Sequence, residues 1–151
     1  MASTQETLDL DGFLPFQLSV TANAVSDVIA RAYRNRFGLR VPEWRLIAIL
    51  AQSPGLTPQQ VCVRARLDKI TVSRAAKALR ARGLIRAQAN ADDRRSHRLE
   101  LSGTGIDLYR AVAPAALALE TRVLAAMTGP ERAQLSDLLQ RVRAAAATIA
   151  T

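Results

Sequence analysis

The chain of 151 residues is poor in the residue types on which most catalytic and metal sites depend. Its one cysteine, Cys62, excludes a disulfide within the chain, and its one histidine, His97, has no cysteine neighbour at metal-site spacing. There is no glycine-rich phosphate loop and no nucleophile elbow. Asp92 and Asp93 are adjacent, so in an extended chain their carboxylates point apart. We therefore expect no catalytic residue, no metal site and no cofactor.

Long apolar runs are also missing. The longest, residues 111–119, contains Pro114 and is far shorter than the roughly 20 residues that span a bilayer. Residues 1–12 carry acidic side chains and no basic one, unlike a secretory signal or a transit peptide. The length and the ordinary apolar content favour a single domain over residues 1–151, cytoplasmic and without membrane contact.

Positive charge is abundant, but only in one segment. The formal net charge is +8 at pH 7, and residues 64–98 contain eleven Lys or Arg against three Asp, which accounts for all of it. The rest of the chain, with ten residues of each sign, is neutral. A basic patch confined to one compact segment is typical of a nucleic-acid-binding protein, because the phosphate backbone supplies the attraction.

Apolar spacing and capping residues predict a mainly α fold with one small β-hairpin. Helices are expected at about residues 14–37, 42–52, 58–65, 69–82, 103–127 and 131–150, with Gly129-Pro130 separating the last two, and strands at 84–88 and 96–101. Thr57 and Asp68 suit helix caps, and Gly38 and Gly83 suit helix ends. Residues 42–101 are then one lobe with the order helix, helix, helix, hairpin.

The helix at residues 69–82 has two different faces. The apolar face has helical spacing and consists of Val72, Ala75, Ala76 and Leu79. The other face and its flanks carry Lys69, Ile70, Thr71, Ser73, Arg74, Lys77 and Arg80. That mixture suits a DNA major groove, because arginine pairs with guanine, hydroxyls bond base edges and isoleucine contacts a thymine methyl. In helix-turn-helix geometry residues 69–74 would reach bases, and Lys77, Arg80 and Arg82 would meet phosphates. The alternative is a solvated helix face.

The loop between the two strands is the second candidate DNA contact. An Asp beside an Arg at the tip of a β-ribbon can hold the Arg extended, and a narrow minor groove attracts such a side chain. Alone, this loop reads equally as an ordinary charged turn. Its position directly after the two-faced helix favours DNA contact by Asp93, Arg94 and Arg95.

An ordered set of short stretches carries a family resemblance. The stretches are Pro42-Glu43-Trp44-Arg45-Leu46, Gly55-Leu56-Thr57-Pro58-Gln59, Leu67-Asp68-Lys69, Val72-Ser73-Arg74, Gly83-Leu84-Ile85 and Asp92-Asp93-Arg94-Arg95-Ser96 leading to Leu101-Ser102-Gly103-Thr104-Gly105. In this order they resemble the winged helix-turn-helix of the MarR family of transcriptional regulators. The resemblance implies Arg95 as a minor-groove finger oriented by Asp93. Arg66 stands where that family commonly has glycine, so we expect either a strained residue or a different shape in this turn, and Cys62 is expected to be a small core residue.

The terminal helices carry more apolar side chains than the lobe can cover. Those of the last two helices are Ile106, Tyr109, Val112, Leu117, Val123, Leu124, Leu135, Leu138, Leu139, Val142 and Ile149. We therefore expect residues 14–37 and 103–150 to be dimerisation helices of a two-fold homodimer, the alternative being a monomer with folded-back helices. Such a dimer would bind double-stranded DNA at an inverted-repeat operator with half-sites about 34 Å apart.

The resemblance further implies a small-molecule effector. Members of the family bind anionic, often aromatic, ligands between the dimer helices and the DNA lobe, which weakens DNA binding. We therefore expect a repressor that such a ligand releases. Trp44 and Arg45 lie near that junction, and an indole with a guanidinium suits an aromatic carboxylate. The alternative is that Trp44 packs in the core and Arg45 forms a surface salt bridge.

Two other functions remain open from the sequence. One is a thiol-redox-sensing regulator of the same fold, which would depend on Cys62, although buried cysteines are usually inert. The other is a winged-helix module whose basic surface binds RNA or an acidic protein, since attraction to phosphate is not base readout.

Overall fold

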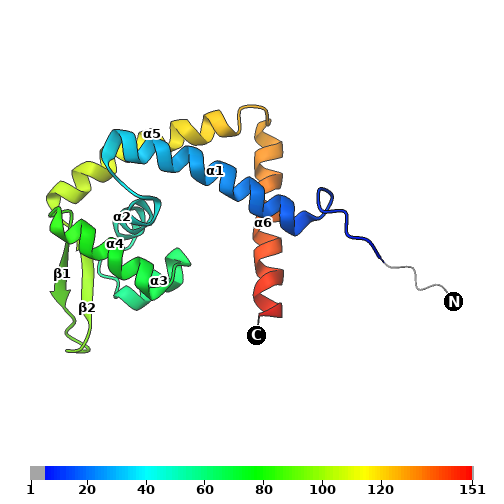
Figure 1. Cartoon of the computed structure of the whole chain (residues 1–151). Coiled ribbons are helices and arrows are strands. Elements are labelled where there is room, and N and C mark those ends of the chain that lie inside the picture. Colours follow the sequence, from blue (N-terminus) through cyan, green and yellow to red (C-terminus); the bar gives the residue numbers. More distant parts are fainter. Residues whose placement is uncertain (1–5, 151) are drawn as a thin grey trace. The chain divides into compact units, whose positions relative to one another are not determined.

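The structure is a computed structural model that describes residues 6–150. Within them the element order is α1 (Leu14–Phe37), α2 (Val41–Gln52), α3 (Pro58–Ala65), α4 (Lys69–Ala81), β1 (Ile85–Ala89), β2 (His97–Leu101), α5 (Gly103–Val123) and α6 (Gly129–Ile149) (Figure 1). The expected fold class, mainly α with one small β-hairpin, is confirmed. The chain divides into two compact units, with the boundary after Pro114 inside α5.

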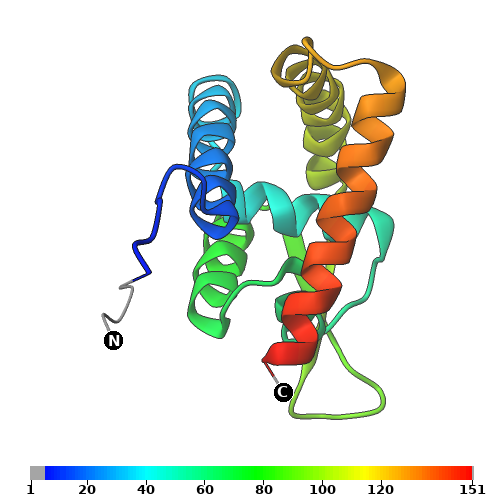
Figure 2. The same ribbon diagram turned by 90° about the vertical axis from the view of Figure 1, so that its right-hand side faces the viewer.

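The core of the first unit lies between α2, α3, α4 and the hairpin. Its buried side chains include Leu46, Ile47, Leu50, Val61, Val72, Leu79, Leu84, Ile85 and Leu99. Burying one such aliphatic side chain contributes about 1.5–3 kcal/mol, so this shared core fixes how α4 and the hairpin are presented. β1 and β2 pair antiparallel, from Ile85 opposite Leu101 to Ala89 opposite His97. Figure 2 shows the hairpin loop projecting beyond the helices of this unit.

Both predicted caps of the helix-turn-helix are confirmed. Thr57 Oγ1 accepts a hydrogen bond from the Gln60 backbone N–H at 3.3 Å, and Gln60 Oε1 accepts one from the Thr57 N–H at 2.9 Å. Asp68 Oδ1 accepts a hydrogen bond from the Thr71 N–H at 2.8 Å. Such caps satisfy N–H groups that have no partner within the helix, and they fix where α3 and α4 begin.

The predicted break between the last two helices is misplaced. The α5 helix ends at Val123, and Gly129 and Pro130 are the first residues of α6. The reason is a capping box: Thr128 Oγ1 accepts from the Glu131 N–H at 3.3 Å, and Glu131 Oε2 accepts from the Thr128 N–H at 2.7 Å. Proline is well tolerated in the first turn, where its missing N–H would be unpaired anyway.

Of the two outcomes expected for the turn between α3 and α4, the structure has the strained residue. Arg66 has φ 52° and ψ 46°, and among the described residues it is the one non-glycine residue with positive φ. Left-handed backbone costs a residue with a Cβ more than it costs glycine. Arg66→Gly should therefore raise the free energy of unfolding by about 0.5–1 kcal/mol, measured by urea denaturation.

Gly83→Ala is the matched control for this prediction. Gly83 has φ 70°, and a Cβ built there meets no atom within 4 Å, so only backbone strain changes. This variant should lose stability where Arg66→Gly gains it. Loss of stability in both variants would show that the Arg66 side chain outweighs the strain at its own backbone.

Candidate nucleic-acid interface

The α4 helix presents the two faces that the sequence predicts. Val72, Ala75 and Leu79 are buried, and Ala76 is half-buried because one side of it borders a groove. On the opposite face Lys69, Ile70, Ser73, Arg74, Lys77 and Arg80 are all exposed. Ile70 is 66% exposed, so its methyl groups are accessible on this face. The helix therefore offers hydroxyl, cationic and methyl groups together on one surface.

Thr71 is the one member of the predicted set on α4 that is not fully exposed. It is half-buried, and its hydroxyl donates to Asp68 Oδ2 at 2.7 Å. The bonds from the Thr71 hydroxyl and backbone stabilise the Asp68 carboxylate and lower the pKa of Asp68. The Thr71 hydroxyl is thus engaged in the helix cap.

Seven of the eleven cations between residues 64 and 98 have no partner. They are Arg66, Lys69, Arg74, Lys77, Arg80, Arg94 and Arg95, all exposed and, within residues 6–150, without a side-chain hydrogen bond or ion pair. Unpaired surface cations retain their full charge for an anionic partner. Arg66 is the one that sequence reasoning missed as a contact, because its place in the turn suggested only a backbone effect.

The other four cations are used inside the first unit. Arg64 donates to Ser53 Oγ and, at 3.1 Å, to Gln52 Oε1. Arg86 Nε lies 2.6 Å from Glu100 Oε1. Arg82, which is expected to meet phosphate, is exposed, and its guanidinium also donates to the backbone carbonyls of Phe37 and Gly38. No sequence signal could show this, since these partners lie 44 and 45 residues away.

Arg98 holds the base of the hairpin loop. Its guanidinium donates to Asn90 Oδ1 at 3.1 Å and to the Gly55 carbonyl at 3.0 Å, and it pairs with Asp92 Oδ2 at 3.1 Å. Asn90 is 7% exposed and also donates through Nδ2 to Ser96 Oγ at 2.8 Å. This network, which sequence reasoning missed, ties the loop to the turn before α3. A polar Asn flanked by alternating strand residues was its only local signal.

The tip of the loop leaves two arginines free. Asp93 Oδ1 accepts a hydrogen bond from the Arg95 backbone N–H at 2.9 Å, so Asp93 shapes the turn through the main chain. The guanidinium groups of Arg94 and Arg95 are exposed and bond to nothing in the described part of the chain. Asp93 therefore orients Arg95 by holding the backbone of Arg95, and not by an ion pair with its guanidinium.

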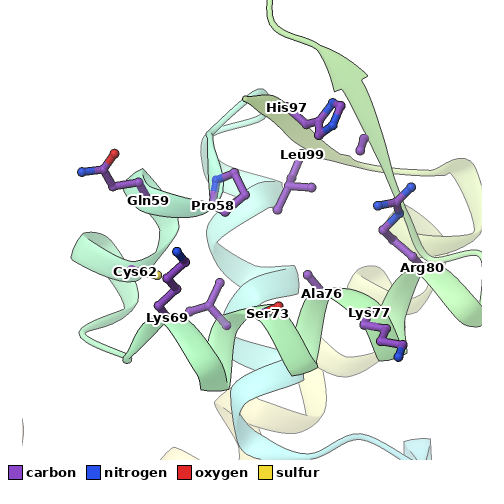
Figure 3. A pocket seen from close by; sticks show the side chains of 12 residues that line it. Pro58, Gln59, Cys62, Lys69, Ser73, Ala76, Lys77, Arg80, His97 and Leu99 are labelled. Carbon is purple, nitrogen blue, oxygen red and sulfur yellow. The ribbon is translucent and has the colours of Figure 1, made fainter. Parts of the chain in front are cut away.

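A groove of about 770 Å³ lies between α3, α4 and the hairpin (Figure 3). It is lined by Pro58, Gln59, Cys62, Lys69, Val72, Ser73, Ala76, Lys77, Arg80, Ala87, His97 and Leu99. No carboxylate is among these residues, so the groove is positive at its rim and apolar at its floor. Cys62 is half-buried at this groove, which corrects the expectation of a closed core position. The groove extends the cationic surface from α4 to the hairpin.

Trp44 lies in an aromatic cluster. Its ring meets Tyr33 of α1 edge-on at 5.5 Å between centroids and stacks on Tyr109 of α5 at 5.9 Å. Burial raises the pKa of Tyr33. Arg45 beside it is exposed and forms no salt bridge among the described residues. The indole is thus packed between helices, whereas the guanidinium is free.

Residues 6–150 contain no group of three or more His, Cys, Asp or Glu side chains placed to hold a metal ion. None of the helices in that range is both long and apolar enough for a membrane crossing.

Comparison with known proteins agrees with this architecture. The model of the MarR family matches residues 37–96. The chain is 26% identical over 105 residues to the HTH-type transcriptional repressor Rv2887 of Mycobacterium tuberculosis, an alignment covering 70% of this chain and 76% of the repressor. A MarR/EmrR family regulator from Acinetobacter sp. ADP1 superposes with a TM-score of 0.85 at 27% identity, covering 93% and 99% of the two chains.

PcaV of Streptomyces coelicolor, solved in complex with its natural ligand, shares the fold with a TM-score of 0.80 at 23% identity, over 94% of this chain and 99% of PcaV. The family match, the repressor relative and the helix-turn-helix with its hairpin wing agree with one another. Residues 37–96 match the MarR family, and the chain is similar in sequence and fold to winged helix-turn-helix transcriptional regulators of that family.

Proposed function

We propose that the protein is a homodimeric repressor that binds an inverted repeat in double-stranded DNA and that a small aromatic anion releases. The observation that carries this proposal is the set of unpaired cations on α4 and the wing. Four arginines of residues 64–98 are bonded internally, so the seven exposed cations of the same segment that have no partner mark a surface for a polyanion.

The α4 helix is proposed to read bases from its first two turns. Ser73 and Arg74 are exposed there beside Lys69, and the Ile70 side chain is available for a thymine methyl. Thr71 contributes by holding the Asp68 cap, which fixes the helix end that enters the groove.

The contacts to the DNA backbone are proposed to come from the rest of the surface. Lys77 and Arg80 lie further along α4 and border the protein's groove between α3, α4 and the hairpin, where the sugar-phosphate backbone of one DNA strand would pass. Arg94 and Arg95 at the wing tip, with the turn shaped by Asp93, would enter the adjacent minor groove. Residues 42–101 are on this view the DNA-binding lobe.

Selection from a random pool of DNA duplexes tests the proposal. At about 150 mM salt, which suppresses non-specific binding, the purified protein should enrich an inverted repeat with half-sites about one helical turn apart. Absence of enrichment, with all binding lost as salt rises, would contradict sequence-specific readout. The same protein retaining single-stranded RNA under those conditions would favour the RNA-binding alternative.

Exposed apolar side chains support the homodimer. On α1, Leu14 is 68% exposed and Val28 45%, and on α6, Val142 is 50% exposed and Ile149 85%. No residue of α6 is buried within the chain, although the helix carries leucines and valines at helical spacing. Residues 14–37 and 103–150 are therefore proposed as the dimerisation helices.

Light scattering should give the mass of a dimer at micromolar concentration. Val142→Asp should shift the population towards monomer, because it places a charge in the proposed apolar interface. Asp137→Asn, on the same helix but in a charged pair with Arg141, is the control and should leave the mass unchanged. A monomeric wild-type protein at that concentration would overturn the dimer.

The effector is proposed to be an aromatic carboxylate that meets Trp44 and Arg45. Arg45 follows Trp44 in α2, is exposed and has no partner among the described residues, and the PcaV structure holds that regulator's natural ligand. Titration with benzoate should change the fluorescence of Trp44, the only tryptophan, and should release bound DNA. Arg45→Ala should weaken both effects about tenfold, the loss expected for one charge-assisted hydrogen bond. Unchanged benzoate affinity in that variant would remove Arg45 from the site.

A further inference from the structure

Arg82, the residue that ends α4, reaches across to the end of α1. Its Nη1 donates to the Gly38 carbonyl at 3.1 Å and its Nη2 to the Phe37 carbonyl at 3.2 Å. Within residues 6–150 no other hydrogen bond joins α4 or its C-terminal cap to α1 or its own cap. A single side chain therefore makes the polar link between these two helices.

The end of α1 is shaped to receive this guanidinium. Gly38 adopts φ 63°, and the N–H groups of Gly38 and Leu39 turn back to the carbonyls of Arg34 and Tyr33. The carbonyls of Phe37 and Gly38, at the very end of this turn, have no partner inside the helix and lie where the helix dipole is negative. A planar guanidinium can bond both carbonyls at once, whereas an ammonium group acts as a point charge.

The two helices joined in this way have different proposed tasks. The α4 helix reads DNA, and α1 is one of the dimerisation helices. In a two-fold dimer the distance between the two α4 helices depends on how each α4 is held relative to its own α1. If the link is rigid, the dimer can bind DNA with a wrong half-site spacing only by straining the link, which lowers its affinity for that DNA. If the link is loose, α4 can adjust to the other spacing.

We infer that Arg82 is a positioning residue that sets the half-site spacing the dimer accepts. The inference rests on the proposed function, in particular on the dimer and its inverted repeat. Arg82 contacts no DNA in this account. Its contribution is selectivity for spacing, which differs from affinity for a half-site.

Binding to a series of DNA duplexes tests the inference. The series contains a single half-site, the selected inverted repeat, and the repeat with its spacing changed by −1, +1 or +2 base pairs. The proteins are the wild type, Arg82→Gln, Arg82→Lys and the matched control Arg64→Gln. Arg64 loses the same charge in the same basic segment, but its bonds to Gln52 and Ser53 stay within α2, α3 and the turn between them.

The wild type and Arg64→Gln should prefer the selected spacing by about tenfold or more over the altered ones. In Arg82→Gln that preference should fall to about threefold or less, while half-site affinity changes no more than in Arg64→Gln. Arg82→Lys keeps the charge but not the two-carbonyl fork, so its spacing preference should lie between the two. Thermal unfolding confirms that each variant is folded.

Three results would overturn the inference, and they are distinguishable. If Arg82→Gln and Arg82→Lys keep the full preference of the wild type, Arg82 does not set the spacing, and the dimeric repressor stands. If the wild type binds all spacings alike, the proposed dimeric readout fails and the inference fails with it. If Arg82→Gln and Arg64→Gln lose affinity equally on every duplex, Arg82 contributes only its charge to DNA binding.

Discussion

Raising the salt concentration from 50 to 200 mM should weaken operator binding by about a thousandfold or more. Each phosphate neutralised by a lysine or arginine releases condensed counterions, so affinity falls with a logarithmic slope of about −0.9 per contact. Residues 64–98 hold seven unpaired cations in each protomer of the proposed dimer, and about three phosphate contacts from each protomer already reach the six or more that a thousandfold loss requires. Fluorescence anisotropy of labelled operator across a salt series gives the slope directly.

Two substitutions separate free cations from paired ones in the same measurement. Arg80→Ala should make the slope shallower by about one per protomer, since Arg80 is exposed and has no partner. Arg86→Gln removes the same charge, but Arg86 is paired with Glu100 at 2.6 Å, so the slope should hardly change. A shallow slope in the wild type, or equal changes in both variants, would show that sequence charge overstates the phosphate contacts.

The local signals of the sequence predicted most of the fold. Helix α1 lies at the predicted residues, and the caps at Thr57 and Asp68 form the predicted hydrogen bonds. These features depend on a few neighbouring residues, so a sequence can show them. The sequence patterns place the start of α6 at Glu131 instead of Gly129, although Thr128 and Glu131 form the same kind of cap, because Gly129-Pro130 is as typical of a helix break as of a first turn.

The candidate site, too, could be predicted from the sequence only where it depends on neighbouring residues. Charge and helical spacing locate the basic surface of α4, but they cannot show which cations are free. Arg82 and Arg98 look equivalent to Arg80 in the sequence, yet their partners at Gly38 and Gly55 lie more than 40 residues away. Only the tertiary structure distinguishes a cation that holds the lobe together from one that is available to DNA.

Replacing Arg74 and Arg80, the two arginines of α4, should impair DNA binding in different ways. Arg74→Ala should cost about 1–3 kcal/mol on the selected operator and should relax the preference at one base position of each half-site. Arg74 lies in the second turn after the Asp68 cap, exposed and unpaired, where a helix-turn-helix contacts base edges. Arg80→Ala should weaken binding to all sequences alike, because a phosphate contact carries no sequence information.

Competition between the operator and single-base variants measures both effects. For Arg74→Ala the affinity ratio between operator and variants should shrink at the contacted position and stay unchanged elsewhere. For Arg80→Ala all ratios should persist while every affinity falls. Both residues are exposed on one helix and their alanine variants lose the same charge, so each is the other's control. Equal behaviour of the two variants would mean that α4 does not enter the groove by its N-terminal end, and base readout would then have to come from residues beyond Arg74.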